Sequence, residues 1–406
     1  MKRAFINARL ILPGAQQTVT GTLLTDGDII AAAGLVEIPS DAEQIDCNGA
    51  LLAPGIVDLG VFAIDKPAFH FGGITRVALM PDQTPVFDLP AMVKFHAAEG
   101  KPDLWSHPLG AATKGLAGEQ LAEIALMKDA GARAIATGRN WIADSGVMLK
   151  LLKYCAALDL AVIIHSEDMG LTRGAVATEG ETATRLGLAS APAISEAMAI
   201  ARDVMLVRLA GARVHFRQVT TAAGLQLVRA AKAEGLPVTC GITPAHLFLN
   251  DQAISDFRTF ARLSPPLRSE DDRQACIAAV SDGTIDVIGS GHDPRGPEDK
   301  RLPFAEAAAG MAGAESLLAL TLGLVREGVV SFNRLFELLA QTPAEILNVD
   351  AGRLATGAAA DFILIDSEAP WQIDARKMAA TAGNTPFDKL PVQGRVTAIY
   401  KGGRRL

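Results

Sequence analysis

Cysteine is scarce in this sequence, and its four cysteines are far apart. Cys47, Cys155, Cys240 and Cys276 form no C-x-x-C pair and no cysteine-dense segment. A disulfide framework needs closely spaced cysteines in an oxidising compartment, so none is expected. The spacing favours reduced, buried thiols in a cytoplasmic protein.

Long apolar runs and basic runs are also missing. The N-terminal segment MKRAFINARLILPG has only a short apolar run before Pro13, and no window approaches the roughly 18 apolar residues of a membrane span. The 38 basic and 45 acidic residues give a formal net charge of −7, and the longest basic stretch is the terminal KGGRRL. Neither a membrane nor a nucleic acid is therefore expected as a partner.

The residues that are abundant indicate a large folded core with two kinds of pattern. Hydrophobic residues make up 49% of the 406 residues. The two chain ends alternate short apolar runs with glycine and aspartate, as antiparallel strands do. The middle alternates strand-like runs with helical periodicity, and eight such runs are LLAPGIVDLG, ITRVALMP, LWSHPLG, ARAIATG, AVIIHSED, RVHFRQVT, PVTCGITP and DVIGSGHDP. Eight strand–helix units predict an α/β fold with a closed (β/α)8 TIM-type barrel.

A barrel of this kind builds its site from the C-terminal ends of its strands. The candidate functional residues are therefore those at the ends of the eight runs. No Gly-x-Ser-x-Gly nucleophile elbow occurs among them. They are Gly60, Phe62, Asp82, His107, Thr137, His165, Glu167, Asp168, Gln218, Thr243, His246, Gly291, His292 and Asp293.

Several segments resemble landmarks of the dihydroorotases of the amidohydrolase superfamily. They occur in the family's order through nearly the whole chain and include IIHSED, LSPPLRSEDDRQACIAAV, GSGHDPRGPEDK, QTPAEILNV and AGNTPFDKLPVQGRV. The resemblance implies a barrel over residues 53–349. It also implies a small β-sandwich domain composed of residues 1–52 and 350–406.

The resemblance further implies a zinc site that is degraded in this chain. In the family the ligands are a His-x-His pair on the first strand, a bridging carboxylate or modified lysine, two single histidines and an aspartate. Transferred to this sequence, those positions are Gly60, Phe62, Thr137, His165, Gln218 and Gly291. Only His165 suits zinc, which needs three or four protein ligands. We therefore expect neither a bound zinc cofactor nor catalytic residues.

The family's substrate contacts are replaced as well. Its carboxylate-binding arginine falls on Ile64, and its two asparagines fall on Asp82 and Ser264. A carboxylate at position 82 would repel an anionic substrate. What remains is a vestigial pocket, which we expect to contain His165, Asp82, Ser264 and His292. A structural role in the barrel wall is an equally good interpretation of His165, and Glu167 with Asp168 is expected to order the following loop.

Three functions are compatible with these observations. The first is a dihydroorotase-like protein of pyrimidine biosynthesis that is catalytically inactive. It would act as a structural partner of aspartate carbamoyltransferase and form homo-oligomers. The second is an active dihydroorotase or cyclic amidohydrolase with a rearranged metal site that uses His165, His246 or His292. The third is a sensor of a pyrimidine precursor, whose carboxylate His292 or Arg295 would bind.

Overall fold

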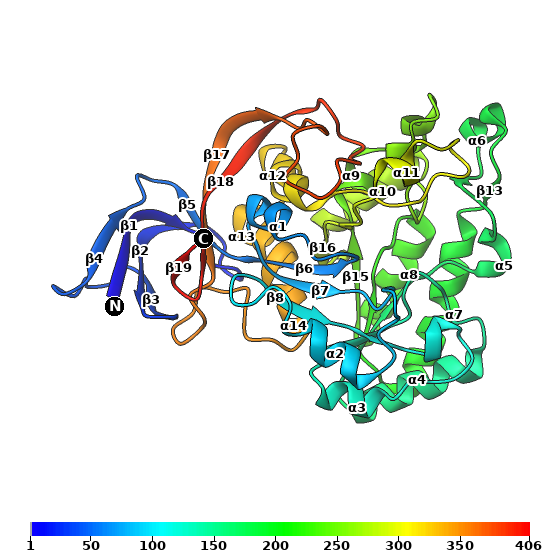
Figure 1. Cartoon of the computed structure of the whole chain (residues 1–406), viewed down its shortest axis with the longest axis horizontal. Helices are drawn as coiled ribbons and strands as arrows, with labels where there is room; N and C mark the ends of the chain where they lie inside the picture. Colours follow the sequence, from blue (N-terminus) through cyan, green and yellow to red (C-terminus); the bar gives the residue numbers. More distant parts are fainter. Residues whose placement is uncertain (1) are drawn as a thin grey trace.

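The computed structural model describes residues 2–406 and has two β-containing parts (Figure 1). A β-rich domain contains both chain termini, and a larger mixed α/β domain lies beside it. Each of the eight expected runs contains a strand. Among residues 2–406, no helix is both long and apolar enough to cross a bilayer.

The β-rich domain is one eight-stranded sheet that combines strands from both ends of the chain. Its hydrogen-bonded order is β19-β18-β17-β5-β1-β2-β3, and β4 pairs with β1. The rings of Phe362 and Tyr400 stack at 4.5 Å in its core, and Phe5 packs edge-on against both. The strands are β1 (Lys2–Leu10), β2 (Val19–Asp26), β3 (Ile29–Gly34), β4 (Glu43–Asp46), β5 (Leu51–Pro54), β17 (Phe362–Gln372), β18 (Pro391–Lys401) and β19 (Arg404–Arg405). The expected domain boundaries at residues 52 and 350 stay a prediction.

The α/β domain contains two sets of parallel strands. The first set has the order β6-β7-β8 and the second β16-β15-β14-β11-β10-β9. These strands are β6 (Ile56–Val61), β7 (Ile74–Leu79), β8 (Trp105–Pro108), β9 (Gly110–Ala111), β10 (Ala134–Ala136), β11 (Ala161–Ile164), β14 (Val214–Phe216), β15 (Val238–Ile242) and β16 (Val287–Ile288). A separate parallel pair is formed by β12 (Ala177–Thr178) and β13 (Ser190–Ala191).

No continuous ladder closes both junctions between the two parallel sets. At one junction the amide of Phe62 donates to the carbonyl of His292 at 2.8 Å. At the other, the chain runs from β8 into β9 through Leu109, whose amide donates to the carbonyl of Leu79 in β7 at 2.9 Å. Within residues 2–406 the structure thus has a mixed α/β fold in which the predicted closed barrel is not confirmed as one uninterrupted sheet.

Helices cover the outside of the parallel strands. Some of their first turns are capped by a short polar side chain: the Thr221 hydroxyl accepts from the Gly224 amide at the start of α8. The helices are α1 (Lys66–Gly72), α2 (Pro90–His96), α3 (Ile124–Asp129), α4 (Ser145–Ala157), α5 (Met169–Thr172), α6 (Glu181–Leu186), α7 (Ile194–Ala210), α8 (Ala222–Ala233), α9 (Pro244–Phe248), α10 (Glu270–Ser281), α11 (Pro297–Lys300), α12 (Leu317–Arg326), α13 (Phe332–Phe336) and α14 (Thr342–Ile346). Single turns of 3-10 helix form η1 (Lys114–Leu116), η2 (Asp251–Ile254), η3 (Thr259–Ala261) and η4 (Ala314–Ser316), and a π-helical turn forms η5 (Glu337–Gln341).

Small and branched side chains fill the space between the two sets of parallel strands. Val57, Leu59, Ala78, Ala134 and Ile163 belong to one buried cluster there. Because these side chains pack the interior, polar groups can be exposed only at the strand ends. This packing places the candidate site at the C-terminal ends of the strands.

Candidate functional site at the strand ends

The six positions that the resemblance assigned to metal ligands offer few ligand atoms. Phe62, Gln218 and Gly291 line a cavity of about 20 Å³, which is room for about one water molecule. His165 lines a neighbouring, larger cavity. Across residues 2–406, no three His, Cys, Asp or Glu side chains converge into a group that could hold a metal ion. The residues present do not fit a zinc centre, because such a centre needs three or four protein ligands.

Two guanidinium groups lie at this end of the strands instead, on the ring of Phe62. The Cζ atom of Arg139 lies 3.6 Å from the ring centroid and that of Arg217 lies 5.2 Å from it. Arg217 is buried, and its Nη2 lies 3.3 Å from Nδ1 of His165. Burial and the nearby charge of Arg139 lower the pKa of Arg217 to about 10, so it remains a cation at neutral pH. A divalent cation placed here would be repelled by both arginines.

Two aspartates hold Arg139 in place. Its backbone amide donates to Oδ1 of Asp82 at 2.8 Å, and its Nη2 donates to Oδ2 of Asp293 at 2.8 Å. Asp82 therefore orders the loop after β10 through Oδ1, while its buried Oδ2 has no hydrogen-bond partner within residues 2–406. Asp293 belongs to the segment after β16, so the contact joins the two sides of the strand ends.

Glycine is favoured by the backbone at two of the positions that the resemblance assigned to metal ligands. Gly60 has φ +97° and Gly291 has φ +60°, conformations that side chains of L-residues rarely adopt. A Cβ atom at Gly60 would lie 3.3 Å from Cδ of Arg217, and one at Gly291 would lie 3.0 Å from Cγ2 of Thr243. Neither position accepts a ligand side chain without a shift of its neighbours.

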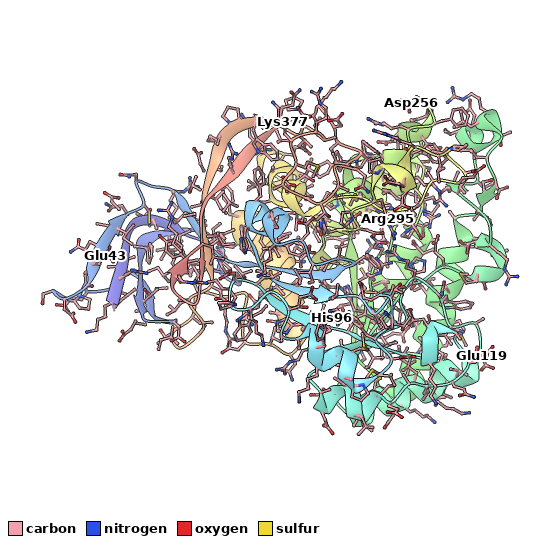
Figure 2. The ribbon with its side chains drawn as sticks, viewed as in Figure 1. Glu43, His96, Glu119, Asp256, Arg295 and Lys377 are labelled. Carbon is pink, nitrogen blue, oxygen red and sulfur yellow. The ribbon has the colours of Figure 1, made fainter. Side chains whose placement is uncertain are left out.

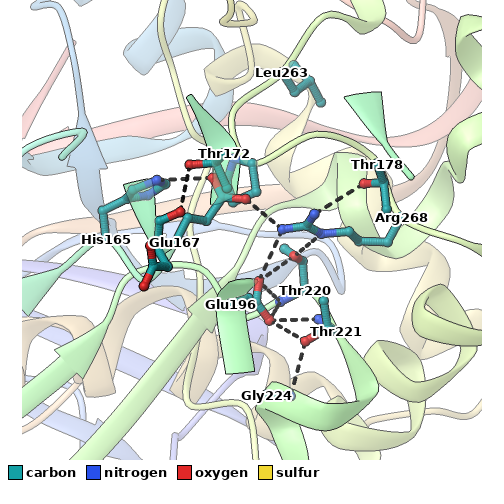
Figure 3. A network of polar contacts seen from close by, with 12 residues as sticks. His165, Glu167, Thr172, Thr178, Glu196, Thr220, Thr221, Gly224, Leu263 and Arg268 are labelled. Atoms are coloured by element: carbon teal, nitrogen blue, oxygen red, sulfur yellow. Dashed lines mark hydrogen bonds and ion pairs between the residues drawn. The ribbon is translucent and has the colours of Figure 1, made fainter. Parts of the chain in front are cut away.

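A buried polar network extends from His165 away from the strand ends (Figure 3). Nε2 of His165 lies 3.2 Å from Oε2 of Glu167, and Oε1 of Glu167 accepts from Nη2 of Arg268 at 2.8 Å. Because Nδ1 of His165 faces a guanidinium donor, the ring proton belongs on Nε2, toward Glu167. Burial alone would raise the pKa of Glu167, but His165 and Arg268 outweigh it and lower that pKa to about 2.

Arg268 also connects this network to a second buried carboxylate. Its Nη2 lies 3.6 Å from Oε2 of Glu196, and its Nε donates to the hydroxyl of Thr220 at 2.9 Å. Glu196 accepts further hydrogen bonds from the amides and hydroxyls of Thr220 and Thr221. These contacts make the His165–Glu167 pair part of a packed framework.

The larger cavity has a volume of about 380 Å³. His165 and Ser264 both line it, so the structure brings these two expected pocket residues together. Arginine dominates its charged lining, with Arg139, Arg173, Arg262 and Arg295. Arg295, two residues before the start of α11, is labelled in Figure 2.

His292 and Asp82, the other two expected pocket residues, have structural contacts. The ring of His292 packs edge-on against Phe69 at 5.2 Å, and its Nε2 lies 3.5 Å from Oδ2 of Asp65. Of the other two candidate histidines, His246 has its Nδ1 2.8 Å from the Thr243 hydroxyl, whereas Nε2 of the buried His107 has no hydrogen-bond partner within residues 2–406. His215, in β14, has its Nδ1 2.9 Å from the Thr239 hydroxyl.

Arg139 and Arg217 were not predicted as site residues. Arg217 precedes Gln218, and strict alternation along a strand would have directed the two side chains to opposite faces. The strand β14 ends at Phe216, however, and both residues line the small cavity beyond its end. The absence of a nearby acidic residue in VHFRQVT was the one signal that Arg217 needed a partner from elsewhere in the fold.

Comparison with solved structures gives the class of the fold. The chain superposes on the L-hydantoinase (dihydropyrimidinase) of Arthrobacter aurescens with a TM-score of 0.90 and 24% identity, covering 100% of this chain and 96% of that one. A dihydropyrimidinase from Brevibacillus agri gives a TM-score of 0.85 at 22% identity. The fold is that of the amidohydrolases of this type.

Sequence comparison gives the family. A model described as dihydro-orotase-like matches residues 49–223. A dihydroorotase of Anaeromyxobacter dehalogenans is 37% identical over 98% of this chain and 95% of its own length, and one of Citrifermentans bemidjiense is 36% identical over 94% and 93%. This chain belongs to the dihydroorotase family of the amidohydrolase superfamily.

Proposed function

We propose that this chain is a non-catalytic dihydroorotase homologue of pyrimidine biosynthesis that acts as a structural partner of aspartate carbamoyltransferase. The observation that carries the proposal is the replacement of metal ligands by cations. Arg139 and Arg217 stack on Phe62 at the strand ends, where zinc would need converging His and carboxylate groups. The same proposal takes the two parallel strand sets as the halves of one (β/α)8 barrel.

The loss of ligands removes the family's hydrolytic chemistry. Attack on a cyclic amide at neutral pH needs an activated hydroxide, which zinc provides by lowering the pKa of its bound water to about 7. A general base must also accept a proton at the reacting centre. The family's aspartate position is Gly291 here, and the nearby carboxylate of Asp293 is bonded to Arg139 at 2.8 Å.

An assay of dihydroorotate hydrolysis with added zinc tests this part of the proposal. The dihydroorotase of Anaeromyxobacter dehalogenans, purified in the same way, is the positive control. We expect turnover by the relative and none above background by this chain. Zinc-dependent turnover that disappears in His165→Gln would instead support the alternative described below.

A structural role requires a docking surface, and α7 provides one. Ile194, Met198, Met205 and Leu209 are 49–66% exposed, and their spacing of four, seven and four residues places them on one face of the helix. Exposed apolar rows of this kind mark protein–protein contacts. This row supports assembly with another protein, for which we propose the carbamoyltransferase.

Co-expression with aspartate carbamoyltransferase of the same organism, followed by size-exclusion chromatography, tests the partnership. We expect a mixed particle that Met205→Lys dissociates. Leu35→Lys is the matched control, because Leu35 is 89% exposed in the β-rich domain, and it should leave the particle intact. Two separate peaks at micromolar concentration, one for each protein, would refute the partnership, whether or not this chain elutes as the expected homo-oligomer.

A second candidate is an active dihydroorotase or cyclic amidohydrolase with a rearranged site. The observation that favours it is the His165–Glu167 pair, 3.2 Å apart, beside a cavity of about 380 Å³. The pair could exchange a proton with a bound substrate. Its other contacts, to Arg217 and Arg268, are those of a fixed structural pair.

A further inference from the structure

We infer that the cavity of about 380 Å³ beside His165 is a receptor site for a small dianion, held by Arg262 and Arg295. This inference goes beyond the proposed function and does not depend on the carbamoyltransferase. Pockets for small molecules begin at about 300 Å³, so this cavity fits a compact metabolite and not a macromolecular segment.

The lining of the cavity is strongly cationic. Four arginines line it, and Glu167 is the one acidic residue among its lining residues. Glu167 is already paired with Arg268 at 2.8 Å, so its negative charge is neutralised by an arginine that does not line the cavity. The cationic excess therefore faces the cavity.

Two of the lining arginines share one carboxylate, that of Asp293, which lines the neighbouring small cavity. Oδ2 of Asp293 accepts from Nη2 of Arg139 at 2.8 Å and from Nη2 of Arg295 at 3.2 Å. A single negative charge cannot neutralise both guanidinium groups. The remaining positive charge is available to an anion.

Buried N–H groups in this cluster lack acceptors. Nε of Arg262 is inaccessible to water and has no hydrogen-bond partner within residues 2–406, and this guanidinium donates instead from Nη1 to the carbonyl of Leu263 at 3.1 Å. Nε of Arg295 lies 3.1 Å from Oδ1 of Asp293 but makes no directed hydrogen bond to it. Unsatisfied buried donors are costly, and an anionic acceptor in the cavity would satisfy them.

The neighbouring Lys300 adds to the positive field. Its Nζ donates to the carbonyls of Ala308 and Thr259 at 2.7 and 3.0 Å, and Ala308 lines the cavity. Burial lowers the pKa of Lys300 to about 8; the charges of Arg262 and Arg295 act in the same direction, and Asp293 opposes them. The three cationic groups are thus close enough to repel one another, which an added dianion would relieve.

Two chemical forms of dianion could fit: paired carboxylates or a phosphate group. Isothermal titration calorimetry of the full chain with succinate and with inorganic phosphate distinguishes them, and acetate serves as the monoanion probe. We expect one or both dianions to bind more tightly than acetate. Arg262→Gln and Arg295→Gln should each weaken that binding on the order of tenfold, the usual effect of losing a charge-assisted bond.

Arg229→Gln is the matched control, because Arg229 is an exposed arginine of α8 paired with Asp282 at 2.7 Å. It should bind as the unchanged chain does. If a buried arginine variant fails to fold, the exposed Arg173→Gln provides the test and should weaken binding severalfold. Absence of binding by both dianions, or equal loss in Arg229→Gln, would overturn the inference. None of these readouts uses turnover or a partner protein, so its failure is distinct from failure of the proposed function.

Discussion

Restoring the family's histidine pair in β6 should destabilise this chain without activating it. The double variant Gly60→His/Phe62→His would supply two imidazoles at the strand end. A non-glycine residue at φ +97° costs about 1–2 kcal/mol. Loss of the Phe62 ring removes the stacking of Arg139 at 3.6 Å, which is worth about 0.5–2 kcal/mol. The sum is a loss of about 1.5–4 kcal/mol in the free energy of unfolding.

Urea denaturation followed by tryptophan fluorescence measures this loss, and dihydroorotate hydrolysis with added zinc measures activity. Gly60→Ala isolates the backbone cost, and Phe62→Leu isolates the loss of the aromatic face. We expect no turnover, because Gln218 and Gly291 still provide neither an imidazole nor a carboxylate. A double variant that is as stable as the unchanged chain, or that hydrolyses dihydroorotate, would refute this reasoning.

Three further outcomes follow from the buried polar groups. Arg268→Met leaves Glu167 and Glu196 buried without their cation and should cost about 3–5 kcal/mol of unfolding free energy in urea, whereas the exposed control Arg229→Met should cost about 0–1 kcal/mol. Burial lowers the pKa of His107 and His215 to about 3 and that of His246 to about 4, so the folded state keeps these rings neutral at pH values where the unfolded state protonates them. The free energy of unfolding should therefore be constant above about pH 6.5 and should fall as the pH drops toward 4, by about 1.4 kcal/mol per pH unit for each ring. Equal stability at pH 7 and pH 5 would contradict this. Finally, burial raises the pKa of Cys155 to about 12 and that of Cys47 to about 11, so a disulfide reagent should label none of the four thiols until denaturant is added.

The sequence predicted the strands of the α/β domain well because buried parallel strands are continuous apolar runs. Each of the eight runs contains a strand, from β6 to β16. How the strand sets meet could not be derived from periodicity, because single hydrogen bonds such as Phe62 to His292 make the junction.

The site was predictable where it depended on residue type and not where it depended on long-range contacts. The absence of ligand atoms at Gly60, Phe62 and Gly291 is visible in the sequence. The cations that replace them are not, because Arg139 reaches the strand ends only through Asp82 and Asp293, which lie far away in the chain. His292 was expected in the pocket, but it follows the left-handed Gly291 and turns toward Phe69.

Zinc content after reconstitution tests the central claim most directly. The purified chain would be incubated with excess zinc, separated from unbound metal by gel filtration and measured by elemental analysis, with the Anaeromyxobacter dehalogenans dihydroorotase treated identically. Two guanidinium groups lie on Phe62, and among residues 2–406 no group of three or more His, Cys, Asp or Glu side chains could hold a metal ion, so we predict no stoichiometric zinc in this chain. One or more zinc ions per chain, lost in His165→Gln, would contradict the account.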